Sequence, residues 1–205
     1  MVDDLALGEV QALGFKAARG AGRAFGVAED AGRAARWLAA RGLDGAGALA
    51  RLLQATDGMA HGALVPRLTD LEPAGAAICP LILGAYLSDA GRVPDAEVGP
   101  VLEPMLLLPF LADLAESSGV RLSAGGTMCV VRAAGLEGAA MPGGPLMVRI
   151  EPVDGPARSA IAMQDRVALS PHAATVLAAF AARILAPATE ASRARGAGAG
   201  GTDID

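Results

Sequence analysis

Long apolar runs and cysteines are scarce in this chain of 205 residues. Its two longest apolar segments, 78–87 and 105–112, each contain a proline and are far shorter than the ~20 residues that a membrane-spanning helix needs. We therefore expect no contact with a membrane. Two cysteines are too few for the disulfide framework of a small secreted protein. Asp3 and Asp4 stand where a signal peptide carries basic residues, so we expect a cytoplasmic protein.

Positive charge and aromatic residues are scarce as well. The chain has 17 basic and 22 acidic residues, which gives a formal net charge of −5, and Lys16 is its single lysine. Aromatic residues make up 3% of the chain and do not cluster with basic residues, as they do on surfaces that stack the bases of nucleic acids. Proteins that bind nucleic acids usually carry a basic surface. We therefore expect no nucleic-acid partner.

Small and aliphatic residues are abundant instead. Hydrophobic residues make up 53% of the sequence, which excludes a disordered chain, and the length allows one domain or two small ones with a sizeable core. A core of Ala, Leu and Val buries little area per residue. Part of the apolar surface is therefore expected to lie in a subunit interface, which predicts a homo-oligomer or a protein bound to a partner.

Residues 1–57 are predicted to form a helical module. Apolar and small residues recur at helical spacing in its first part, and Gly20 and Gly22 mark the end of that helix. A second helix is predicted over residues 26–41 and a third over residues 43–55. The short loops between them favour a compact packing of the three helices.

Residues 58–205 are predicted to form an α+β portion that makes one compact unit with the helical module. The predicted elements are helices over 78–89 and 105–118, strands over 120–123, 128–133, 146–153 and 159–169, and a helix from Ser170 to about residue 185. Residues 91–104 contain several glycines and prolines and are predicted to be a connection. The fold class is therefore α+β: helices, then a small antiparallel sheet, then a closing helix.

Cys79 is the candidate nucleophile and His61 the candidate base. If Pro80 is the first residue of its helix, Cys79 is the cap residue, and the amide groups of the first turn would lower the pKa of its thiol. His61 lies in a glycine-bearing loop, where a histidine is a usable base. The alternatives are that Cys79 is a small buried residue and that His61 faces solvent.

No metal site and no cofactor are expected. The two cysteines and two histidines lie at positions 61, 79, 129 and 172, without the closely spaced pairs that are typical of zinc sites. The glycine-rich run near the C-terminus lacks the Gly-Lys-Ser/Thr ending of a phosphate-binding loop.

The C-terminal segment 187–205 is the most unusual part of the sequence. Polar residues precede its glycine-rich run, namely Thr189, Glu190, Ser192, Arg193 and Arg195. Backbone amides of such a run can approach an anion, and an arginine can pair with it. These residues are therefore candidates for binding a small-molecule anion, and the alternative is a frayed terminus.

Several segments resemble a small bacterial family of proteins of about this length, known only as a domain of unknown function. The resemblance rests on the tail 187–205, on Ile78-Cys79-Pro80, on the run Pro-Met-Leu-Leu-Leu-Pro-Phe over 104–110, and on residues 29–37. It covers nearly the whole chain. It implies no activity, substrate or cofactor, but it implies that the tail is a defined part of the sequence.

A second likeness covers residues 5–53 only. These residues are similar to the opening helices of the NAD-dependent malate/L-lactate dehydrogenase family that is unrelated to the Rossmann enzymes. That family carries Arg-Gly-His-Asp-Ser-His-Gly after its second helix, where this chain has Arg-Gly-Leu-Asp-Gly-Ala-Gly over 41–47. Because both histidines are missing, the likeness implies a similar packing of three helices and no catalytic residue.

Two hypotheses for function follow. We favour an oligomeric or partner-dependent component without catalytic activity, because few titratable groups stand at a spacing typical of a catalytic site. The alternative is a small-molecule-binding protein or an enzyme, with Cys79 as nucleophile, His61 as base and Arg193 as an anion contact. Whether the protein is an enzyme is left open.

Overall fold

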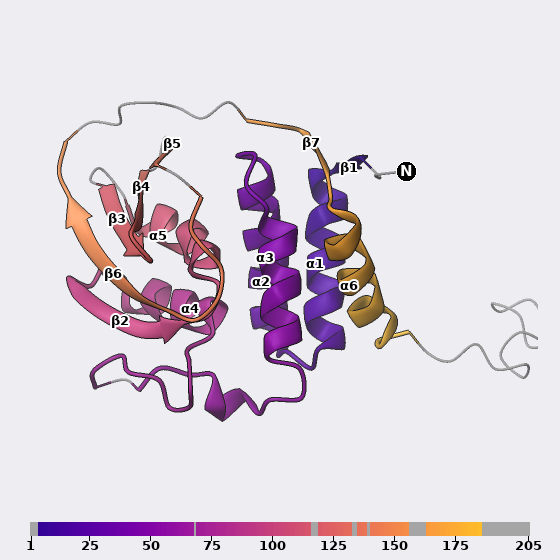
Figure 1. Ribbon diagram of the computed structural model, residues 1–205, viewed down its shortest axis with the longest axis horizontal. Helices are drawn as coiled ribbons and strands as arrows, with labels where there is room; N and C mark the ends of the chain where they lie inside the picture. The colour runs from indigo at the N-terminus through magenta and orange to yellow at the C-terminus, as the bar shows by residue number, and fades with distance from the viewer. Residues whose placement is uncertain are drawn as a thin grey trace, which may run out of the picture.

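Three helices follow one another near the start of the chain, as predicted. We describe the fold from a computed structural model, which defines residues 4–67, 69–115, 119–132, 135–138, 140–155 and 163–185. The three helices are α1 (Leu7–Gly20), α2 (Phe25–Ala39) and α3 (Gly45–Ala55). They pack against one another as a layer (Figure 1). The three helices predicted in this part of the chain are therefore confirmed.

The first two helices approach each other closely because glycines face each other where they cross. A Cβ atom on Gly14 of α1 would lie 3.2 Å from the Cα atom of Gly32 on α2. A Cβ atom on Gly32 would lie 2.5 Å from the carbonyl oxygen of Gln11. Residues without a side chain thus let the two backbones come closer than most other residues would allow.

A fourth helix, from much later in the chain, joins this layer. α6 (Pro171–Ala182) begins at Ser170, whose hydroxyl accepts a hydrogen bond from the Ala173 amide over 3.2 Å. It packs against α1 and α3. Gly20 permits this contact, since a Cβ atom there would lie 1.8 Å from the Phe180 carbonyl oxygen. The closing helix and its Ser-Pro start are confirmed, and the boundary between residues 1–57 and 58–205 stays a prediction.

A short antiparallel pair of strands lies where α1 and α6 begin. β1 (Asp4–Ala6) pairs with β7 (Arg166–Ala168), and the Arg166 Nε donates to Asp4 Oδ2 over 2.8 Å. β1 is absent from the strands predicted from the sequence. β7 is shorter than the predicted range 159–169, of which residues 159–162 lie outside the described part of the chain. A strand of three residues is too short to show the alternation of apolar and polar residues from which strands are predicted.

Within the described ranges, five antiparallel strands form the second sheet. Their order is β2-β6-β3-β4-β5, and their bounds are β2 (Ala96–Val101), β3 (Gly119–Ala124), β4 (Thr127–Arg132), β5 (Gly135–Gly138) and β6 (Leu146–Val153). β3 and β4 form a hairpin whose two-residue turn, Gly125 and Gly126, has φ angles of +54° and +77°. Positive φ at both turn positions is what such hairpins require. The small antiparallel sheet is therefore confirmed.

The predicted connection over residues 91–104 is wrong in its middle, where β2 lies. β2 is the edge strand of the sheet and pairs with β6, while Ile78 forms a single parallel bridge with Val101 on its other side. The register of β2 on β6 shifts between Val98 and Val101, and such an irregularity in an edge strand accommodates Gly99 and Pro100. β5 was missed as well, since it is four residues long and has glycine at both ends.

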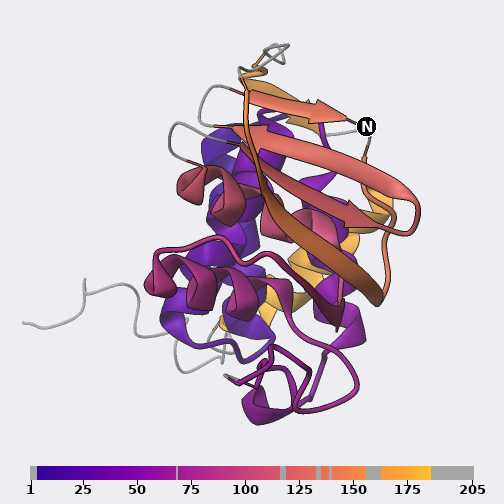
Figure 2. The same cartoon turned by 90° about the vertical axis from the view of Figure 1, so that its left-hand side faces the viewer.

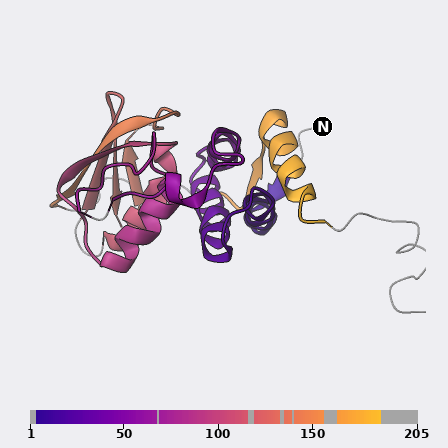
Figure 3. The same ribbon diagram turned by 90° about the horizontal axis from the view of Figure 1, so that it is seen from below.

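Two helices fill the space between this sheet and the helical layer. α4 (Pro80–Ala90) packs against α2 and α5, and α5 (Leu108–Leu114) packs against β3 and β4. The shorter helices η1 (His61–Ala63) and η2 (Pro104–Leu107) precede them in the chain. Figure 2 shows the sheet in front of the helices. Figure 3 shows the sheet on one side, α6 on the opposite side and the N-terminal helices, drawn in indigo and purple, between them. The α+β class is confirmed.

No helix in the described part of the chain is long and apolar enough to cross a membrane. The longest of these helices is α2, with 15 residues, several of which are charged.

Candidate functional site

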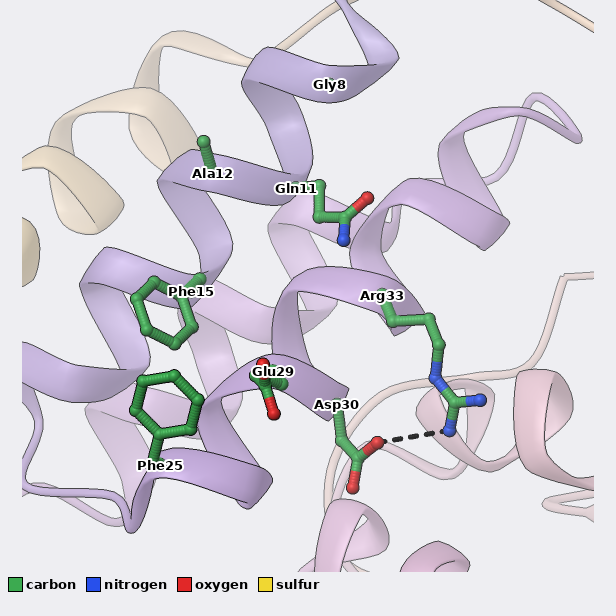
Figure 4. A pocket seen from close by; sticks show the side chains of 8 residues that line it. All are labelled: Gly8, Gln11, Ala12, Phe15, Phe25, Glu29, Asp30 and Arg33. Carbon is green, nitrogen blue, oxygen red and sulfur yellow. Dashed lines mark hydrogen bonds and ion pairs between the residues drawn. The ribbon is translucent and has the colours of Figure 1, made fainter.

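A groove of about 560 Å³ lies between α1 and α2. Four residues of each helix line it: Gly8, Gln11, Ala12 and Phe15 of α1, and Phe25, Glu29, Asp30 and Arg33 of α2 (Figure 4). The volume falls within the range of sites that bind small molecules, which is roughly 300–1,000 Å³.

The spacing of these residues explains why they face one space. On each helix they recur at intervals of three or four residues, which places them on one face. The two helices are held close by Gly14 and Gly32, so the two lined faces stay near each other. The small residues Gly8 and Ala12 leave space between these two faces. A Cβ atom on Gly8 would meet no described atom within 4 Å.

Phe15 and Phe25 form the apolar end of the groove. Their ring centroids lie 5.4 Å apart, with an angle of 74° between the ring planes. This is an edge-to-face contact, which aromatic rings favour. Phe25 is 59% exposed, although phenylalanine is usually buried. Half of the four phenylalanines in the chain thus lie at this groove, and they offer a flat apolar group a contact surface.

Arg33 is shared between two carboxylates at the other end. Its Nη2 lies 3.1 Å from Asp30 Oδ1, and its Nη1 donates to Asp113 Oδ2 over 2.8 Å. The guanidinium also lies over the Phe110 ring, 5.2 Å from its centroid. Arg33 is therefore held in place by Asp30 of α2 and Asp113 of α5, and its charge is already matched.

The two carboxylates that line the groove, Glu29 and Asp30, are not fully balanced by positive charge. Burial raises the pKa of the Asp30 carboxyl above its ordinary value, and the charge and hydrogen bond of Arg33 oppose this shift. The charges of Glu29 and Asp89 raise the same pKa further. Glu29 makes no ion pair with any residue that the structure defines. This end of the groove is thus short of positive charge.

The position predicted for Cys79 is confirmed, whereas the predicted effect on its thiol is wrong. Cys79 is the cap residue of α4 and Pro80 is the first helical residue. The side chain is 1% exposed, and this burial raises the pKa of the thiol. Hydrogen bonds from the amides of Ile82 and Leu81 oppose the shift, but they are outweighed. Desolvation of the thiolate thus exceeds the favourable effect of the helix start.

The other predicted site residues are not brought together with Cys79. His61 lies in η1 and is exposed, and no hydrogen bond joins these two described side chains. A role of Cys79 or His61 in chemistry stays a prediction. The five candidate residues of the tail, Thr189, Glu190, Ser192, Arg193 and Arg195, lie outside the described residues.

The described residues hold no group of three or more His, Cys, Asp or Glu side chains that is placed to bind a metal ion. Cys79 and Cys129 are both buried and unbridged. His172, in the first turn of α6, is exposed.

The groove was missed from the sequence because its parts lie on two helices. None of its lining residues is among the candidate site residues predicted from the sequence. The signal that was available is the presence of two phenylalanines, Phe15 and Phe25, near charged residues in a chain with few aromatic residues.

Comparisons with known proteins add one finding. Searches of curated proteins and of solved structures gave no match to the chain. A family model does match, over residues 5–79, a stretch that includes α1, α2 and α3 and ends at Cys79. Over these residues the chain is therefore similar to the family described as "Protein of unknown function (DUF3726)", which confirms there the resemblance to a domain of unknown function.

Proposed function

We propose that the protein is a cytoplasmic, non-catalytic binding component, and that the α1–α2 groove holds a small organic molecule. The observation that carries this proposal is the groove itself, with its volume of about 560 Å³ and its mixture of apolar and charged lining. Sites for small molecules usually combine an apolar surface with a few polar groups that fix the orientation of the ligand.

The proposed ligand lies with an apolar group against Phe15 and Phe25. Phe25 would lose much of its contact with water on binding, and the burial of apolar surface is the main favourable term in such an association. The charged end of the groove, with Asp30 held by Arg33, would then fix the direction in which the ligand lies. The Asp30–Arg33–Asp113 contacts hold this end in shape before the ligand arrives.

The test is a screen by nuclear magnetic resonance with small aromatic compounds of positive, zero and negative charge. We expect at least one compound to shift the amide signals of Gln11 and Glu29. Ala12→Phe, at an exposed lining position, should abolish these shifts by filling the groove. Ala55→Phe, at the exposed end of α3, is the matched control and should leave them unchanged. Shifts that persist in Ala12→Phe, or that lie elsewhere, would contradict the proposal.

We also propose that the protein is a homo-oligomer whose subunits meet at α6. This helix is apolar on nearly all sides, but within the described part of the chain only one of its sides is covered, by α1 and α3. Its other side exposes Ala178, Ala179 and Ala182, and Ile184 and Leu185 follow with exposures of 44% and 70%. A helix that is apolar all round is usually buried on all sides, which favours a second copy as its cover.

Analytical ultracentrifugation tests this second proposal. The wild-type protein should sediment as a species heavier than the 20.4 kDa chain. Ala179→Glu should return it to that mass, because it places a charge in the interface, whereas Gln54→Glu on the exposed side of α3 should not. A wild-type protein that is monomeric at all concentrations would exclude the proposed interface.

A further inference from the structure

We infer that the molecule held in the α1–α2 groove is an organic cation, with a protonated amine next to an aromatic or other flat apolar group. This inference rests on the proposed function, since it names the ligand class of the same groove.

The first support is the balance of charge at the groove. Its lining contains two carboxylates, Glu29 and Asp30, and one cation, Arg33. Asp113 binds the other side of Arg33, and Asp89 lies close enough to act on Asp30. Among the eight lining residues, two carboxylates therefore stand against one cation, and Arg36, beside the groove, donates to Gln11 Oε1 over 3.0 Å. A ligand that brings a positive charge is favoured by this balance, and one that brings a negative charge is disfavoured.

The second support is that Arg33 has little capacity left for an anion. Its Nη2 and Nη1 atoms are directed to Asp30 and Asp113, at 3.1 Å and 2.8 Å, and its flat face covers Phe110. A ligand carboxylate or phosphate would have to displace one of these carboxylates. An ammonium group would instead add a partner for Glu29, which has none among the described residues.

The third support is the arrangement along α2. Phe25, Glu29 and Arg33 are spaced by four residues, so successive side chains are about one helical turn, or ~5–6 Å, apart. Figure 4 shows Phe15 and Phe25 together at one end, with Glu29 beside Phe25 and Asp30 and Arg33 beyond it. A ligand that satisfies both ends therefore needs a short link between its ring and its amine. The faces of the two rings also attract a cation.

The experiment compares three probes that differ in charge but share a phenyl ring and a short link. These are 2-phenylethylamine, 2-phenylethanol and 3-phenylpropionate, measured by titration calorimetry at neutral pH. We expect the amine to bind at least fivefold more tightly than the alcohol and the carboxylate to bind most weakly. Glu29→Gln should weaken the amine about two- to fivefold, the range expected for an exposed charge pair, and leave the alcohol unchanged. Glu97→Gln, on an exposed position of β2, is the matched control and should change neither.

The possible outcomes separate this inference from the proposed function. If the alcohol binds as tightly as the amine, and Ala12→Phe abolishes both, the groove is a binding site but the inferred charge of its ligand is wrong. If the carboxylate binds best, Arg33 is the main contact and the inference is again overturned. If none of the three probes binds, or if binding survives Ala12→Phe, the proposed function itself fails.

Discussion

Arg51 of α3 donates two hydrogen bonds to the buried carboxylate of Glu103. The Arg51 Nε and Nη2 atoms lie 3.1 Å and 2.9 Å from Glu103 Oε2, and the Glu103 side chain is 6% exposed. The other carboxylate oxygen accepts a hydrogen bond from the Gly144 amide over 3.0 Å. Glu103 also has a φ angle of +42°, which is unfavourable for a residue with a side chain. This contact joins α3 to the segment that follows β2 and to the segment that precedes β6.

We therefore expect Glu103→Ala to lower the free energy of unfolding by about 1–3 kcal/mol, because it leaves the partly buried Gly144 amide and part of Arg51 without an acceptor. The measurement is urea unfolding followed by circular dichroism. Glu97→Ala, at an exposed position of β2, is the control and should change the value by less than about 0.5 kcal/mol. Equal effects of the two substitutions would show that the Arg51 contact does not stabilise the fold.

The crossing of α1 and α2 gives a second prediction. Gly32→Ala should destabilise the protein by about 1–3 kcal/mol, since its Cβ atom would lie 2.5 Å from the Gln11 carbonyl oxygen and would push the helices apart. Gly26→Ala in the same helix meets nothing within 4 Å and should be neutral or stabilising, because alanine favours a helix over glycine. Thermal unfolding of both variants provides the comparison. A stable Gly32→Ala protein would contradict the close packing on which the groove depends.

The thiols give a third prediction. Burial raises the pKa of Cys79, and it raises the pKa of Cys129 to about 11, so both thiols stay protonated at pH 8. A protonated, buried thiol reacts slowly with aromatic disulfide reagents. The folded protein should therefore label slowly, and the protein in urea should label rapidly at both of its cysteines. If one thiol of the folded wild-type protein is labelled rapidly, and this rapid labelling is absent from the Cys79→Ala variant, Cys79 is again a candidate nucleophile.

The fourth prediction is the pH dependence of amine binding. The pKa of Asp30 is raised above its ordinary value, chiefly by burial, so Asp30 gains a proton at a higher pH than an exposed aspartate does. Below that pKa the groove has lost one negative charge, and the affinity for 2-phenylethylamine should fall as the pH falls through it. The affinity for 2-phenylethanol should stay constant over the same range. Calorimetric titrations at several acidic pH values test this prediction. If the affinity falls equally for both probes, the cause is general unfolding and not the charge of Asp30.

Much of the secondary structure was predictable from local sequence. The strand predicted over residues 146–153 has the same bounds as β6, because its alternating pattern reflects one exposed and one buried face. The Ser170-Pro171 pair correctly predicted the start of α6, since a capping side chain and a first-turn proline act within a few residues. β2 was missed because its Gly99 and Pro100 resemble a loop unless the edge position of the strand is known.

The candidate site was less predictable, because it depends on contacts between distant residues. The cap position of Cys79 follows from the proline beside it, but its burial depends on the whole core, and burial determines the pKa of its thiol. The groove depends on the contact of Gly14 with Gly32 and on Phe15 meeting Phe25 from another helix. The sequence pattern of a single helix gives no information on these distances between residues of two helices.

The most direct test of the groove as a binding site is an isotope-filtered nuclear Overhauser measurement on the labelled protein with bound, unlabelled 2-phenylethylamine. The account predicts contacts from the ring protons of the probe to the rings of Phe15 and Phe25, and from the methylene next to its nitrogen to the side chains of Glu29 and Asp30. Saturating binding with contacts to any other part of the molecule, or with the probe in the reverse direction, would contradict it.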